Sequence, residues 1–129
     1  MKSIITFLLF SIFCFAQTAE FNNLNKEGKF EEYISEAGIS FKVGDKVKIG
    51  LPGAGNRYNF ITQGNEQCGT AITGKTVTIS KIRVIGTKKK GFICFLLFSG
   101  YGLSVYIHTE PALQTNELIL LEENTNQSP

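Results

Sequence analysis

The chain has 129 residues, with 13 Lys or Arg against 11 Asp or Glu and a net charge of +2 at pH 7. This length predicts one domain, and the near balance of charge provides no strong field toward nucleic acid or anionic lipid. A single histidine excludes a metal site built from several histidines, and no pattern in the sequence predicts a cofactor.

Residues 1–16 have the features of a secretory signal peptide. Lys2 precedes an apolar run of about 12 residues, and Ala16 closes it with a small residue of the kind that a signal peptidase reads. We therefore expect cleavage before Gln17 and an exported protein, periplasmic or extracellular. The run is shorter than the ~20 residues that span a bilayer, so no transmembrane anchor is expected after cleavage.

Cleavage leaves two cysteines, Cys68 and Cys94, in a compartment that permits disulfides. A bridge between them would close a loop of about 25 residues and add roughly 3.5 kcal/mol to the stability in the chain-entropy description. The alternative is that Cys94, inside an apolar run, is a buried thiol that never meets Cys68. The sequence leaves both open.

Residues 17–40 form an N-terminal segment in which we expect one short helix, over residues 26–38. Gly38 suits the end of that helix. Packing must hold so short a helix, because propensity alone does not. Its apolar residues recur at spacings of three and four: Phe30, Tyr33, Ile34 and Ala37.

Within residues 41–50, turn chemistry at 43–45 leads into a first expected strand, and a second strand is expected over residues 58–62, after a loop. In the first strand Val47 and Ile49 point to one face, and the lysines that alternate with them point to the other. A long polar connection follows over residues 63–74.

Residues 75–108 are expected to form a three-stranded antiparallel meander, because β-rich runs alternate there with glycine-containing turns. In a regular first strand, Val77 and Ile79 would point to one face and Ile82 and Val84 to the other, although all four are apolar. An extra residue repairs such a shift, and a bulge is therefore predicted at 80–81. The strands are 75–85, 92–98 (central and covered on both faces) and 103–108 (with Leu103, Val105 and Ile107 toward the core).

The chain closes with a turn of helix over residues 109–115, a last strand over 117–121 and a disordered tail over 122–129. Five to six short antiparallel strands with one bent strand suggest a small SH3-like barrel over residues 41–121. The predicted fold class is therefore mostly β.

Two patterns resemble those of small exported bacterial proteins with an SH3-like domain. They are Phe41-x-Val-Gly-Asp-x-Val-x-Ile-Gly50 and Ala112-Leu113-x-x-x-Glu117-Leu118, and the likeness covers residues 41–121. Such patterns carry Gly where Asn116 stands here, and Asn tolerates a positive φ nearly as well. The resemblance implies a fold and no activity, since that family brings no established chemistry.

Exposed aromatic residues lead to the main functional hypothesis. Barrels of this class bind peptides in aromatic-lined grooves, and Tyr58, Tyr101 and Tyr106 are the candidate ligand-binding residues. Lys88, Lys89 and Lys90 at a hairpin tip are a second candidate, for a phosphate or an acidic polymer, although such a turn is usually just solvated. We expect an exported, non-enzymatic module that binds a protein or cell-envelope component, with no nucleic acid partner.

The alternatives are a thiol-dependent hydrolase that uses Cys68 and His108, or a subunit of an envelope assembly. The surroundings of Cys68 faintly resemble those of papain-like nucleophiles, but no helix is expected behind it. A relay from Ser104 to His108 fails, because residues four apart on a strand lie roughly 13 Å from each other.

Overall fold

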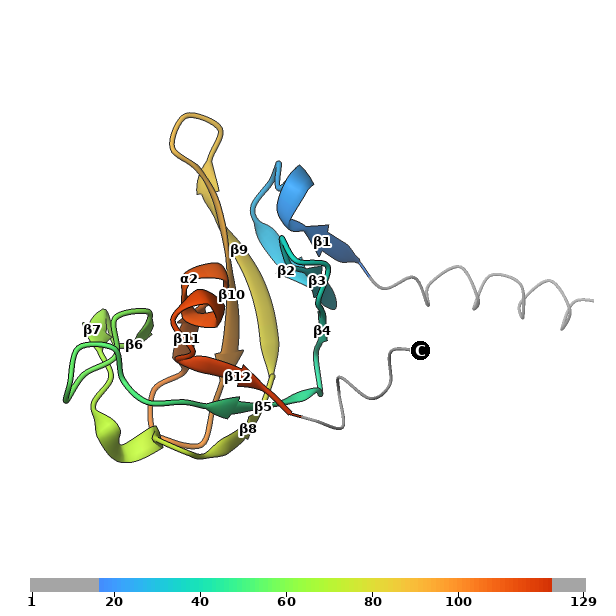
Figure 1. The fold of residues 1–129 in the computed structure, drawn as a ribbon. Coiled ribbons are helices and arrows are strands. Elements are labelled where there is room, and N and C mark those ends of the chain that lie inside the picture. The colour runs from blue at the N-terminus through green and yellow to red at the C-terminus, as the bar shows by residue number, and fades with distance from the viewer. Residues whose placement is uncertain (1–16, 122–129) are drawn as a thin grey trace, which may run out of the picture.

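The computed structural model describes residues 17–121, in which strands dominate and form three sheets (Figure 1). The predicted mostly β class is confirmed. The largest sheet has the order β2-β9-β10-β11-β6-β7, and all of its pairings are antiparallel. Its strands are β2 (Gly28–Phe30), β6 (Ile61–Gln63), β7 (Glu66–Gln67), β9 (Lys81–Thr87), β10 (Gly91–Phe98) and β11 (Val105–His108).

Two smaller sheets have three strands each. One has the order β1-β3-β4 and includes a parallel pair, and the other has the order β12-β5-β8 and is antiparallel. Their strands are β1 (Thr18–Glu20), β3 (Glu32–Ile34), β4 (Ser40–Lys42), β5 (Lys46–Ile49), β8 (Thr76–Thr78) and β12 (Leu118–Leu120). The helical segments are α2 (Thr109–Gln114) and the 3-10 turns η1 (Phe21–Asn23) and η2 (Thr70–Ile72).

One hydrophobic core joins all three sheets. Alternate residues of the six-stranded sheet, among them Ile82, Leu96 and Ile107, are buried in a cluster with Tyr33 of β3 and Val47 of β5. This is the two-residue periodicity expected of strands with one face on a core. The predicted inward positions at Val77, Ile79, Val105 and Ile107 are all buried.

The strand predicted over 75–85 with a bulge at 80–81 is instead two strands that belong to different sheets. β8 ends at Thr78 and β9 begins at Lys81, and the two residues between them belong to different ladders. The amide of Ile79 donates to Asp45 O at 2.8 Å, and that of Ser80 donates to Leu97 O at 2.8 Å. The chain thus leaves the β12-β5-β8 sheet and enters the six-stranded sheet within two residues.

The helix predicted over residues 26–38 is wrong. That stretch contains β2 and β3, and Phe30 and Tyr33 are buried from two separate strands. Spacings of three and four also arise when two short strands follow each other across a bend at Glu31. Hydrogen-bonded partners for both strands decide the outcome: β9 for β2, and β1 and β4 for β3.

A closed barrel is not formed within residues 17–121, since the three sheets stay distinct. Two strand limits also differ from expectation. β6 begins at Ile61 instead of residue 58, and β11 begins at Val105, which leaves Leu103 67% exposed in the preceding turn. That turn has two glycines at positive φ, so the alternation of the strand does not extend into it.

The C-terminal elements are confirmed. α2 and β12 lie where a turn of helix and a last strand were expected, and Asn116 between them has a φ of 61°. The predicted signal peptide (1–16) and disordered tail (122–129) lie outside the described residues. Within the described residues, none of the helical segments has the length and apolar character needed to cross a bilayer.

Candidate functional site

Tyr58 is a core residue and not a ligand-binding one. Its side chain is 0% exposed. Its hydroxyl donates to Gly50 O at 2.6 Å and lies 2.7 Å from Thr73 Oγ1. Burial raises the pKa of Tyr58. Because β6 starts three residues later than predicted, Tyr58 lies in the loop before the strand, and its buried side chain holds that loop against the core.

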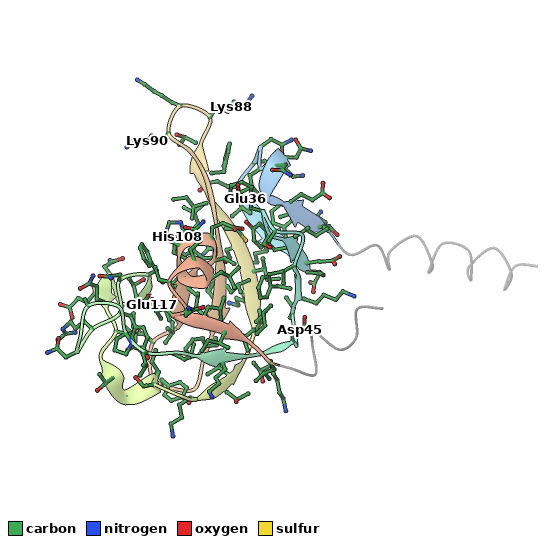
Figure 2. All side chains as sticks on the ribbon, in the orientation of Figure 1. Glu36, Asp45, Lys88, Lys90, His108 and Glu117 are labelled. Atoms are coloured by element: carbon green, nitrogen blue, oxygen red, sulfur yellow. The ribbon has the colours of Figure 1, made fainter. Side chains whose placement is uncertain are left out.

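The remaining predicted ligand-binding residues do not form one rim. Tyr101 lies in the turn after β10, 39% exposed, with its ring edge-on to Phe98 at 5.8 Å. Lys88, Lys89 and Lys90 are exposed in the turn before β10, at the tip of the hairpin in Figure 2. At about 3.3 Å per residue, the eight residues of β10 hold the two turns roughly 25 Å apart.

Tyr106 belongs to a group of side chains on the outer face of the six-stranded sheet. The register places Phe95 of β10 opposite both Arg83 of β9 and His108 of β11. The Phe95 ring lies 5.8 Å from that of Tyr106, nearly perpendicular, and 5.5 Å from that of His108. Edge-to-face pairs of this kind add stability beyond the area they bury.

Phe60 and Arg83 extend this group at both ends. The Phe60 ring lies 6.2 Å from that of His108, whose backbone amide donates to Phe60 O at 2.8 Å. Nη1 of Arg83 donates to the Tyr106 hydroxyl at 3.3 Å. All five side chains are partly exposed. We call them the outer-face cluster: Phe60, Arg83, Phe95, Tyr106 and His108.

The charged side chains that the strands place on this face are positive. Lys29 pairs with Arg83, and Lys81 pairs with Leu97, so both lysines share the face of the cluster. The other positions in phase with them on the six described strands include no Asp or Glu: Thr62, Gln67, Ile85, Thr87, Ile93, Phe95, Leu97, Tyr106 and His108. Acidic groups on a ligand would therefore meet no like charge from these strands.

His108 is half-buried, and burial lowers its pKa against an opposing effect of the Glu110 carboxylate. At neutral pH the imidazole is therefore neutral. It contributes ring surface and a hydrogen-bonding nitrogen to the cluster, and no charge.

Cys68 and Cys94 are free thiols and not a disulfide, and both are buried. Cys68 follows β7, and its amide donates to Ile61 O, so its side chain shares the buried face of Ile61. His108 packs against Phe60 on the opposite face. Burial raises the pKa of both thiols, which keeps them protonated at neutral pH. This arrangement provides no Cys68–His108 dyad.

Glu117, labelled in Figure 2, is fully buried and accepts three backbone hydrogen bonds. Its Oε2 accepts from the amides of Gly53 at 2.7 Å and Asn59 at 2.8 Å, and its Oε1 from Phe60 at 2.9 Å. In the sequence, Glu117 was part of the pattern that ends the SH3-like resemblance, and no role was predicted for its side chain. The structure shows that it holds the loop leading to β6, and with it Phe60 at the edge of the cluster.

Within residues 17–121, no three His, Cys, Asp or Glu side chains come together in a way that could hold a metal ion. Phe95 was not predicted as a site residue, because residues 92–98 are apolar on both faces of the strand. The alternation of Tyr106 and His108 in β11 did predict that this face of the sheet is exposed.

Comparisons with protein-family models, curated proteins and solved structures found no match.

Proposed function

We propose that this protein is an exported, non-enzymatic binding module that recognises a protein or cell-envelope component through the outer-face cluster. Export rests on the leader-like residues 1–16. An SH3-like organisation is part of the proposal. It is supported by the position of β5 between β12 and β8, the kinked passage from β8 to β9, the β9–β10–β11 meander and the helix before the last strand.

The observation that carries the function is the composition of the cluster. Aromatic residues and arginine are the side chains most enriched among those that dominate binding energy. Here three aromatic rings, an imidazole and a guanidinium contact one another before any ligand arrives. Such mutual support lowers the entropy lost on binding, because the side chains are already restrained.

The charge of the face indicates which class of ligand it can bind. Lys29, Lys81 and Arg83 share it without an acidic residue in phase on the described strands. We therefore expect the ligand to present acidic groups next to an apolar or aromatic surface. Raised salt should weaken the interaction, since it screens exposed charges beyond a Debye length of about 8 Å at physiological ionic strength.

The test is affinity capture from envelope extracts of the native host, with the mature chain as bait and quantification of bound proteins and polymers. Tyr106→Ala should reduce capture of the specific partner by about tenfold or more, as for a central interface residue. Tyr101→Ala is the matched control, because it removes an exposed tyrosine whose ring packs on Phe98 and not on the cluster. Equal capture by wild type and Tyr106→Ala would refute the role of the cluster.

The same capture tests the alternative of a subunit: a partner that stays bound in fixed stoichiometry through purification would make the protein a subunit of an envelope assembly. No feature of the described residues favours the thiol-hydrolase alternative, since Cys68 and His108 lie on opposite faces of the sheet.

A further inference from the structure

β12 has an unpaired edge. It is the first strand in the order β12-β5-β8, so β5 occupies one side of it and no strand within residues 17–121 pairs with the other. Such an edge presents backbone N–H and C=O groups that are ready to pair with another strand. Ile119 in the middle of β12 is 37% exposed, and no proline interrupts the strand.

A groove runs along this strand. It has a volume of about 490 Å³, within the ~300–1,000 Å³ of typical ligand sites. Its lining comes from β12, from α2 and from the connection between β3 and β4. The apolar part of the lining includes Ala37, Ile39, Leu113 and the residues of β12.

Carboxylates line the same groove. Glu36 and Glu110 both belong to its wall, and no Lys or Arg does. The Tyr33 hydroxyl donates to the Glu110 carboxylate, which also accepts from the Glu36 amide at 3.3 Å. Glu110 is therefore held in place, while the Glu36 side chain is exposed. An apolar surface with two negative charges and no positive one fits a ligand that is apolar and basic.

We propose that this groove binds an extended segment of another protein, which adds a strand to β12, places apolar side chains in the groove and directs Lys or Arg toward Glu36 and Glu110. Strand addition obtains affinity from backbone hydrogen bonds and specificity from alternate side chains. This site is distinct from the outer-face cluster, whose positive charge suits acidic ligands.

The charge pattern argues against this chain as its own ligand. Residues 122–129, which follow β12, contain two Glu and no Lys or Arg. A strand added from the β12 region of a second copy would offer acidic residues, and no basic one, to Glu36 and Glu110. Like charges in such close positions are unfavourable, so a basic segment from a different protein is the occupant that the groove favours.

The probe is a fluorescein-labelled, capped hexapeptide Lys-Thr-Val-Thr-Lys-Thr, in which Lys and Val share one face of the strand. It is titrated against the protein at low salt and followed by fluorescence anisotropy. A peptide with Glu in place of Lys should not bind. Methylation of the backbone nitrogens on one edge of the peptide should weaken binding by about tenfold, because it removes the donors that face β12. Amide NMR signals of residues 118–120 should shift on binding of the parent peptide.

Glu36→Gln should weaken binding of the Lys–Val peptide about two- to fivefold, as expected for the loss of one exposed charge. Glu31→Gln is the control, an exposed glutamate outside the groove. Equal binding of the Lys and Glu peptides, shifts confined to the outer-face cluster, or no saturable binding would each overturn the proposal. So would a dimer in sedimentation that is lost on Ile119→Lys, because a second copy would then be the occupant.

Discussion

Glu117 shows how one side chain can organise a loop. Its carboxylate accepts from three backbone amides while it is fully buried. Removal of a partner that leaves buried donors unsatisfied costs about 1–3 kcal/mol, more when a charged group is involved. The geometry also explains Gly53, where an added Cβ would lie 2.9 Å from Glu117 Oε2.

We predict that Glu117→Gln lowers the free energy of unfolding by about 2–3 kcal/mol, because the new NH₂ group faces backbone donors instead of accepting from them. Urea denaturation of the protein measures this. Glu66→Gln removes an exposed carboxylate from the edge strand β7 and should change stability by less than about 0.5 kcal/mol. Similar values for the two variants would mean that the three hydrogen bonds contribute little.

At the scale of elements, the turn between α2 and β12 depends on its backbone conformation. Asn116 has a φ of 61°, a region that costs an ordinary side chain roughly 1–2 kcal/mol. Its carbonyl oxygen also lies so close to Gly50 that a Cβ there would collide with it. The junction of β12 and β5 therefore depends on the left-handed backbone of Asn116 and on the absence of a side chain at Gly50, which lies against it.

Asn116→Ala should lower the free energy of unfolding by about 1 kcal/mol, while Asn116→Gly should leave it within about 0.5 kcal/mol of wild type. Thermal unfolding followed by circular dichroism distinguishes them. Asn25→Ala is the control, an exposed asparagine in a connection with no positive φ. If Asn116→Ala were as stable as Asn116→Gly, the left-handed turn would not be under strain.

Strands were predictable where alternation was regular. Val47 and Ile49, or Val105 and Ile107, recur at intervals of two, and these segments are strands with those residues buried. The N-terminal segment was misread because two short strands can imitate helical spacing. The identity of their partners, β9 and β1, is long-range information that no local pattern contains.

At the scale of the whole molecule, the candidate site was only partly predictable. Tyr106 was expected to be exposed on a wet face, and it does join the outer-face cluster. Phe95 and Arg83 join it because the register of β9, β10 and β11 aligns them, and register is set by pairing and not by composition. Tyr58 was excluded by a three-residue shift in the start of β6.

The stability of the fold should depend on pH through His108. Burial lowers its pKa in the folded protein, so below the unfolded value of about 6.5 the unfolded chain binds more protons and is favoured. We predict that the loss of unfolding free energy between pH 7 and pH 5 is smaller in His108→Gln than in wild type. Urea denaturation at both pH values checks this, and an equal loss in the two proteins would contradict it.

The pairing of β12 with β5 has a consequence for biogenesis. It joins Leu118 to Ile49, which are 69 positions apart (118 minus 49). Contacts so distant in sequence form late, because loop closure must precede them. A nascent chain lacking its last dozen residues has no partner for that side of β5. Such a chain would leave the β12-β5-β8 sheet incomplete, so completion of the fold waits for the last residues to be synthesised.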